Sequence, residues 1–337
     1  MKRNMKEWVV EMINSPVKKA LPVLSFPAIQ KMNITVKELI SSSDLQAEAM
    51  KVIADNTNAA ASVSFMDLSV EAQCFGAEIR MSDEEVPTVI GSVINSEEDA
   101  KALEVPEVAS GRTSLYIEAI RKVAPMINDR PILAGVIGPF SLAGRLMDVS
   151  EAMIYCYEEP DMVHVVLEKV TEFIIKYILE FKVAGANGVV MAEPLAGLLS
   201  PNLAGEFSAD YVKRIIDAVQ DDEFIVVYHN CGNSVIPQVE EIVKTGASVL
   251  HFGNAIDLRE ILPLIPETIV VAGNIDPAGQ FKNGTVESIA KETKALLEDC
   301  DKYPNFLISS GCDIPPMSKW ENIDAFFAVV DEFYATK

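Results

Sequence analysis

EFIVVYHNCG, residues 223–232, is a run of apolar residues that ends abruptly in polar ones. After Glu223 the run is continuously apolar and does not alternate between apolar and polar residues. A continuous pattern is typical of a parallel strand that is buried on both faces. The stretch therefore predicts an interior strand of an α/β fold, with His229 and Cys231 at its carboxyl end.

Seven further runs of this kind occur along the chain, at 22–27, 61–67, 131–140, 187–194, 248–254, 268–276 and 306–312. The stretches between them carry apolar residues at three- and four-residue spacing, which predicts amphipathic helices. These stretches span residues 44–57, 113–125, 163–185, 208–220, 235–246, 258–265, 285–300 and 321–336. Strand–helix alternation repeated eight times predicts a TIM (β/α)8 barrel. A doubly wound open sheet is the alternative, but no glycine-rich nucleotide fingerprint follows the first strand.

Residues 74–110 interrupt the simple alternation after the second predicted strand. CFGAEIRMSDEEVPTVIGSVI (74–94) predicts a hairpin-like insertion, and NSEEDAKALEVPE (95–107) predicts an acidic loop. No low-complexity linker and no internal repeat divides the chain. We therefore expect one barrel domain over residues 1–337, with an N-terminal helical extension over about residues 1–20.

The charge of the chain narrows the class of partner. The 337 residues carry a formal net charge of −22, which argues against a nucleic acid, because phosphate binding needs a basic face. It equally disfavours an anionic membrane surface. The charge fits a protein that handles a small molecule or docks on a partner with a complementary patch.

Features of secretion are missing from the sequence. The five cysteines are odd in number and scattered, unlike a disulfide framework. The first residues lack the apolar core of a signal peptide, and no stretch approaches the ~20 apolar residues of a membrane span. We therefore expect a cytoplasmic protein with reduced thiols.

Polar side chains follow most of the predicted strands, and in a barrel the chemistry collects at these strand ends. The candidates are Asp67, Glu193, His229, Cys231, Asn254, Asp276 and Cys312. Asp67 and Asp276 could equally be loop caps. His251 is a rival metal ligand, but it precedes its strand end and fits a core histidine equally well.

His229, Cys231 and Cys312 form a pattern suited to zinc. Residues i and i+2 of extended chain point to the same side, so His229 and Cys231 can converge on one ion. Cys312 lies at the end of another predicted strand, on the same rim of a barrel. Three nitrogen and sulfur ligands leave one tetrahedral position open, as in catalytic zinc sites. Taken singly, each residue is more often a packing residue than a ligand.

Several segments resemble the uroporphyrinogen decarboxylase superfamily. Within it they are most similar to the corrinoid-dependent methyltransferase branch, typified by methylcobamide:coenzyme M methyltransferases. The segments are MDLSVEAQCFGA (66–77), GPFSLAGRLM (138–147), AEPLAGLLSP (192–201), HNCGN (229–233), GNIDP (273–277) and SSGCDIP (309–315). The decarboxylase itself is a poorer match. Its substrate bears many carboxylates and needs arginines early in the chain, and residues 20–32 contain none.

The resemblance implies a zinc-dependent methyltransferase on a TIM barrel, with His229, Cys231 and Cys312 as the zinc ligands. It implies transfer of a methyl group from a methylated corrinoid to a thiol such as coenzyme M. The chain has no D-x-H-x-x-G corrinoid signature, so the corrinoid is expected on a separate protein. Glu193 is our candidate catalytic residue, either filling the fourth zinc position at rest or shaping the pocket. Substrate contacts are assigned to Asp67, Asn254 and Asp276.

Three other functions remain open from the sequence. A methyltransferase could run the opposite half-reaction, moving a methyl group from a methoxy or methylamine-type compound onto a corrinoid protein. A decarboxylase-like enzyme is the second. A non-catalytic metal-binding partner of a corrinoid protein is the third.

Overall fold

A curled sheet of seven parallel strands forms the centre of the protein, whose computed structural model describes residues 3–335. The strands neighbour one another in chain order, and nearly all of their residues are buried. They are β1 (Ser62–Val63), β4 (Ile132–Ile137), β5 (Gly188–Ala192), β6 (Ile225–Asn230), β7 (Val249–Phe252), β8 (Val270–Ile275) and β9 (Phe306–Ser310). Sequential parallel order is the topology of a barrel and excludes the doubly wound sheet.

Residues 20–24 take the place of the eighth strand and join the two edges of the sheet. Beside β1, the amide of Ala60 donates to the carbonyl of Ala20 at 2.7 Å, and Leu21 donates to Ile308 of β9 at 2.9 Å. Pro22 has no N–H to give, and the amide of Val23 bonds to a side chain, the hydroxyl of Ser310, at 3.0 Å. The predicted strand at 22–27 is therefore wrong as a regular strand, and the backbone bonds that close the ring come from residues 20 and 21, just before it.

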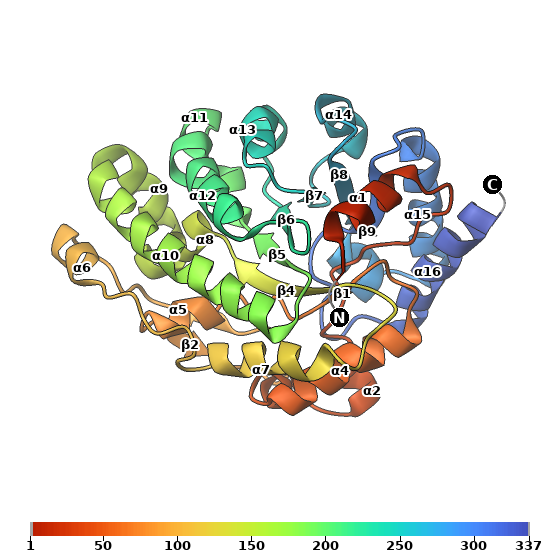
Figure 1. Cartoon of the computed structure of the whole chain (residues 1–337), viewed down its shortest axis with the longest axis horizontal. Helices are drawn as coiled ribbons and strands as arrows, with labels where there is room; N and C mark the ends of the chain where they lie inside the picture. Colours follow the sequence, from red (N-terminus) through yellow and green to blue (C-terminus); the bar gives the residue numbers. More distant parts are fainter. Residues whose placement is uncertain (1–2, 336–337) are drawn as a thin grey trace.

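The eight predicted helical stretches all contain helix, and these helices surround the strands (Figure 1). They are α4 (Ser43–Asn56), α7 (Thr113–Val123), α10 (Pro160–Ala184), α12 (Asp210–Val219), α13 (Val239–Lys244), α14 (Leu258–Ile261), α15 (Val286–Cys300) and α16 (Trp320–Ala335). Residue 336, the last of the predicted set, lies outside the described residues. Within the part of the chain that the structure describes, no helix is both long enough and apolar enough to cross a membrane.

The helix α1 (Met5–Asn14) lies within the N-terminal stretch that was expected to be helical. Further helices lie outside the predicted stretches. They are α2 (Ala28–Met32), α3 (Val36–Ile40), α5 (Val70–Cys74), α6 (Glu97–Ala102), α8 (Pro139–Met147), α9 (Val149–Glu158) and α11 (Pro201–Ala204). Shorter turns of 3₁₀ or π type are η1 (Pro194–Leu198), η2 (Gly205–Ala209), η3 (Ile236–Gln238), η4 (Leu262–Leu264) and η5 (Pro277–Lys282). The strands are all shorter than the predicted runs: β1 has only two residues, and β4 ends before the proline that starts α8.

The insertion after β1 is a hairpin followed by a helix. The strands β2 (Glu78–Arg80) and β3 (Thr88–Ile90) pair antiparallel, as predicted. The acidic stretch after it was expected to be a loop, and the structure corrects this with α6. The hydroxyl of Ser96 accepts a hydrogen bond from the amide of Asp99 at 3.2 Å, and three acidic residues occupy the first turn. Both features stabilise a helix N-terminus, so the charges favour the helix.

Apolar side chains fill the barrel interior from the amino end up to the site. Val190, Val227 and Leu307 belong to this inner cluster, and Met5 and Trp8 of α1 join it from below. The amide of Met5 donates to the carbonyl of Asp222, just before β6, at 2.7 Å, which fixes α1 at the amino end. The polar chemistry is thereby confined to the carboxyl end of the strands.

Candidate zinc site

His229, Cys231 and Cys312 come together at the carboxyl end of the barrel. His229 is the penultimate residue of β6, Cys231 directly follows that strand, and Cys312 follows β9 by two residues. One donor atom from each residue lies within 4.8 Å of the other two. Nε2 of His229 is 3.4 Å from Sγ of Cys312. The structure thus brings together the three residues that the sequence pattern assigned to one metal ion.

The three donor atoms fit a zinc ion in number, kind and spacing. Zinc bonds of about 2.0–2.1 Å to nitrogen and 2.3 Å to sulfur, at tetrahedral angles, set the ligand atoms roughly 3.5–3.8 Å apart. The observed separation of 3.4 Å between His229 and Cys312 is close to this value. His229 is buried and the two cysteines are half-buried, so the triplet is held by the protein and stays open toward one side.

The thiols of Cys231 and Cys312 form a hydrogen bond with each other. A hydrogen bond from Cys312 lowers the pKa of the Cys231 thiol. The same hydrogen bond, together with burial, raises the pKa of Cys312 to about 12. Cys231 is therefore the more readily ionised thiol of the two.

His251 stands behind His229 and contacts it directly. The two residues are in register on the adjacent parallel strands β7 and β6, and their Nδ1 atoms lie 2.8 Å apart. Nε2 of His251 is 2.7 Å from the hydroxyl of Ser309. Burial lowers the pKa of His251 well below its ordinary value, and His229 adds to this effect. Since both of its nitrogens have partners, His251 is not a rival ligand in this arrangement.

A cavity of about 80 Å³ adjoins the triplet. Apolar side chains, among them Met66, Leu68 and Ala192, make up most of its lining, which also includes Asp313. One carboxylate oxygen of Asp313 is buried and has no hydrogen-bond partner within the described chain. Burial, with a contribution from Cys312, raises the pKa of Asp313 well above its ordinary value. Asp313 directly follows Cys312, and the sequence already places both after the last predicted strand.

Glu193 lies beneath the rim and not at the triplet. It is fully buried, and its carboxylate accepts hydrogen bonds from the amides of Phe140 and Ser141 at 2.7 and 2.9 Å and from the hydroxyl of Ser208 at 2.8 Å. Burial raises its pKa. These contacts tie β5 to the N-terminus of α8 and to η2. Both oxygens are occupied in the structure, which does not bring them to the three ligands.

Asp67 is likewise held by other side chains. It is buried and forms an ion pair with Arg112, and it accepts hydrogen bonds from the hydroxyls of Tyr116 and Ser69. Its sequence neighbours Met66 and Leu68 line the cavity. Asp67 itself is directed into a buried polar network.

The other two predicted substrate contacts do not line the cavity either. Asp276 accepts hydrogen bonds from the amides of Ala278 and Gly279 at 3.0 and 2.9 Å, so it caps η5. Asn254 is exposed, and its backbone lies against Gly311. A Cβ added at Gly311 would stand 2.7 Å from the backbone nitrogen of Asn254. Asn254 therefore lies beside the residue that precedes Cys312, without lining the cavity.

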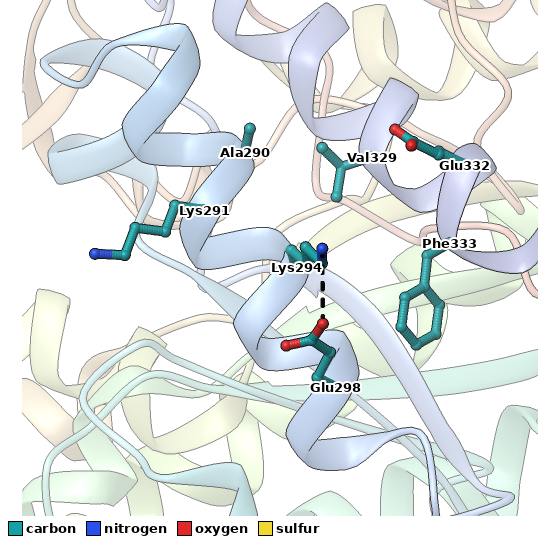
Figure 2. A pocket seen from close by; sticks show the side chains of 7 residues that line it. All are labelled: Ala290, Lys291, Lys294, Glu298, Val329, Glu332 and Phe333. Atoms are coloured by element: carbon teal, nitrogen blue, oxygen red, sulfur yellow. Dashed lines mark ion pairs between the residues drawn. The ribbon is translucent and has the colours of Figure 1, made fainter.

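A second hollow lies on the outside of the barrel, between α15 and α16 (Figure 2). Lys291, Lys294 and Glu298 line it from one helix, and Val329, Glu332 and Phe333 from the other. Figure 2 shows the ion pair between Lys294 and Glu298 across one turn of α15. None of the residues at the strand ends reaches this hollow, so it is not part of the candidate zinc site.

Comparison with known families identifies the class of the protein. Residues 16–333 match the uroporphyrinogen decarboxylase (URO-D) family, and the chain belongs to this family.

Individual relatives are more specific. Methylcobamide:CoM methyltransferase MtbA of Methanosarcina acetivorans is 28% identical over 262 residues, covering 76% of this chain and 75% of the relative. Methylcobamide:CoM methyltransferase MtaA of Methanosarcina barkeri is 28% identical over 275 residues, covering 80% and 78%. Uroporphyrinogen decarboxylase of Coxiella burnetii is 25% identical over 286 residues, covering 81% and 77%. These names confirm the predicted superfamily, its methyltransferase branch, and an enzyme of the methyltransferase class.

Solved structures confirm the fold. A methyltransferase from Methanosarcina mazei matches with a TM-score of 0.86 at 24% identity, and the match covers 99% of both chains. A B12-independent methionine synthase from Shewanella sp. W3-18-1 matches with a TM-score of 0.61 at 13% identity, over 96% of this chain and 99% of that chain. At these identities the likeness concerns the fold alone, and it bears out the predicted barrel.

Proposed function

We propose that this protein is a zinc-dependent methyltransferase. It moves a methyl group from a methylated corrinoid, carried on a separate corrinoid protein, to a small thiol such as coenzyme M. One observation carries the proposal: His229, Cys231 and Cys312 converge beside a mostly apolar cavity at the carboxyl end of the barrel. The relatives named methylcobamide:CoM methyltransferases support the choice of reaction.

The three ligands would prepare the thiol for attack. When bound, zinc supplies the positive charge that lowers the pKa of a coordinated thiol and keeps it ionised near neutral pH. Two thiolates and one neutral imidazole balance the charge of the ion, which leaves the substrate sulfur nucleophilic. The apolar side chains of Met66 and Leu68 keep water away from that sulfur.

The proposed methyl transfer needs only the thiol and the methylated corrinoid as reactants. The substrate sulfur forms a bond to the methyl carbon while the cobalt–carbon bond breaks. The electron pair of the broken bond stays on cobalt, which leaves as Co(I), and the thiol proton is released to solvent. The site has to hold the sulfur in line with the methyl group, since geometry of this kind contributes much of such rate enhancements.

The size of the cavity supports a methyl donor that stays outside it. Its volume of about 80 Å³ has room for only a few water molecules, each of which needs at least ~10–15 Å³ of such space. A thiol sulfur with a short carbon chain fits this space, and a corrinoid ring does not. The donor would dock over the rim and present its methyl group. The net charge of −22 favours a partner with basic patches.

The cavity lining argues against decarboxylation of a polycarboxylate. Such a substrate requires several cationic side chains around it, and neither arginine nor lysine lines the cavity. His229, Cys231, Cys312 and Asp313 are its ionisable members. The nitrogen and sulfur ligands would moreover have no role in a metal-free decarboxylase.

The five cysteines are free in the structure, which agrees with a cytoplasmic location. Reduced thiols are the normal state in that compartment, and the proposed ligands require them. We therefore place the protein there as part of the same proposal.

Metal content tests the proposal first. Protein purified without added metal should hold about one zinc per chain. Cys312→Ser should hold none, and the matched control Cys74→Ser, a half-buried cysteine on α5, should keep it. Wild-type protein without zinc would overturn the proposal.

The methyl acceptor is tested next with free methylcobalamin as the donor. Loss of its methyl–cobalt absorbance in the presence of coenzyme M or homocysteine is the expected result, and it should require zinc. Methylation of cob(I)alamin by a methylamine, with no thiol accepted, would instead establish the opposite half-reaction.

A further inference from the structure

We propose that His251 is a positioning residue that fixes the tautomer of His229, so that the lone pair of Nε2 faces the two cysteines. The proposal rests on the zinc site proposed above and adds to it a requirement on residues that are not ligands. It follows from one chain of hydrogen bonds that runs from the backbone of residue 21 to the imidazole of His229.

The chain of hydrogen bonds begins at the carbonyl of Leu21. A carbonyl oxygen only accepts, so the hydroxyl of Ser309, at 2.6 Å, must give its hydrogen to it. The same hydroxyl oxygen is then available as an acceptor for Nε2 of His251 at 2.7 Å. Nε2 of His251 consequently carries a hydrogen.

Two assignments remain for the contact of 2.8 Å between the Nδ1 atoms of the two histidines. Either His229 donates to a neutral His251, or a doubly protonated His251 donates to His229. The second requires an imidazolium ion at a residue that is 1% exposed. Its side-chain partners are a serine hydroxyl and another imidazole, its other contacts are backbone groups of His251 and Ser310, and none of these is an anion. An uncompensated buried charge is costly, so His229 is the donor.

Because Nδ1 of His229 donates a hydrogen bond, the protonation state of its Nε2 is also determined. A neutral imidazole carries one hydrogen, so Nε2 of His229 is bare and presents a lone pair. This atom lies 3.4 Å from Sγ of Cys312 and belongs to the set of converging donor atoms. In free histidine the opposite tautomer predominates, with the hydrogen on Nε2. His251 therefore prevents a proton from occupying the position that zinc needs.

The barrel builds this chain from three of its strands. His229 and His251 occupy matching positions on β6 and β7, and Ser309 on β9 reaches His251 past β8, the strand between them. Residues 20–24 supply the terminal carbonyl. The irregular segment that closes the ring thus also ends the chain of hydrogen bonds. Closure of the barrel and the tautomer of His229 are therefore linked.

Two substitutions separate the hydrogen bond from the bulk of His251. In His251→Asn the amide oxygen can still accept from Nδ1 of His229, whereas His251→Leu removes every acceptor. Ser310→Ala is the control, because Ser310 is a buried neighbour on β9 whose hydroxyl binds the amide of Val23 and neither histidine. Circular dichroism would first establish that each variant is folded.

Nitrogen NMR of histidine-labelled protein reads the tautomer without any metal. The chain has three histidines, so the signals are assignable by substitution. Metal-free wild-type protein should show His229 protonated at Nδ1 and bare at Nε2. His251→Asn and Ser310→Ala should keep this pattern, and His251→Leu should shift His229 toward the Nε2–H form. A wild-type His229 protonated at Nε2 would overturn the inference by itself.

Zinc affinity, measured by competition with a chromophoric chelator, gives the second readout. Loss of a partner that orients a metal-bound histidine typically weakens metal affinity about 10- to 100-fold, which is the loss expected for His251→Leu. His251→Asn should stay within roughly threefold of wild type, and equal weakening in both variants would contradict the inference. Failure of the proposed function is distinguishable, because wild-type protein would then bind no zinc while the tautomer of His229 remained measurable.

Discussion

Two clusters of buried polar side chains lie at the carboxyl end of the barrel, and they differ in what satisfies them. The carboxylate of Asp67 is satisfied entirely by protein groups, namely Arg112, Tyr116 and Ser69. Cys231 and Cys312 instead turn their sulfurs toward each other and toward a cavity. Most buried polar groups in proteins have protein partners, so the cluster without sufficient partners is the one that indicates a ligand.

Buried polar side chains that have enough protein partners form the framework of the barrel rim, and those that lack such partners form the candidate site. Glu193 belongs with Asp67, because three hydrogen bonds from α8 and η2 satisfy its carboxylate. Both carboxylates occupy strand ends, where catalytic residues of barrels are found, and the structure uses them to hold loops around the cavity. A residue at a strand end is therefore a candidate only until its partners are known.

Substitution in the cavity cluster should have the largest effect. Cys231→Ser removes the thiol that ionises most readily, so we expect loss of zinc and a fall in thiol methylation of at least about a thousandfold. The melting temperature in the presence of a chelator should match that of chelated wild-type protein, because the side chain faces a cavity. A large drop in the stability of the metal-free form would instead place Cys231 in the framework.

The framework cluster should show the opposite response. Asp67→Asn leaves the buried guanidinium of Arg112, whose side chain is 10% exposed, without its anion, which costs about 3–5 kcal/mol of unfolding free energy. Zinc content should be unchanged. The exposed pair of Arg259 and Asp257 is the matched control, and Asp257→Asn should cost no more than ~1 kcal/mol. Urea unfolding measures both, and normal stability with lost thiol binding would make Asp67 a substrate residue.

Glu71, which lies beside Asp67, should make the free energy of unfolding depend on pH. Burial raises the pKa of Glu71 from 4.5 to about 7. Between these pH values the folded protein retains a proton that the unfolded chain has lost, so the free energy of unfolding falls as the pH rises.

Glu71→Gln removes this titration, and it keeps the acceptor for the amide of Ile137. Between pH 5 and pH 8 the variant should gain roughly 2–3 kcal/mol of stability relative to wild type. Urea unfolding at the two pH values tests this. The exposed Glu267→Gln is the control and should show no such gain. A gain in both variants would show that the trend belongs to the whole acidic chain.

The sequence was sufficient for the barrel and for the convergence of His229, Cys231 and Cys312, because both depend on local patterns. Continuous apolar runs identified the strands, and the single residue between His229 and Cys231 fixed their common direction. Cys312 followed from its place after another strand. Each of these inferences needs only the order of strands and the direction of side chains.

The remaining assignments depended on partners that are distant in sequence. Glu193 is satisfied by amides at 140 and 141, and Asp67 by a guanidinium at 112. Register between β6 and β7 places His251 on His229, and a periodic pattern does not reveal register. Pro22 could have warned that the first strand would be irregular, since proline removes a ladder hydrogen bond.

Asp276 offers the smallest effect and the finest test of the comparison. It was predicted to contact substrate, and the structure shows it capping η5 through the amides of Ala278 and Gly279. As a cap alone, Asp276→Ala should lower the unfolding free energy by about 1 kcal/mol, Asp276→Asn should restore most of it, and the KM for the thiol should stay the same in both. If the KM rises several-fold in both variants while Asp276→Asn is as stable as wild type, the carboxylate charge acts on the substrate. Asp276 would then belong to the cavity cluster although its hydrogen bonds are satisfied. The hydrogen-bond partners of a residue would in that case no longer be enough to distinguish framework residues from site residues.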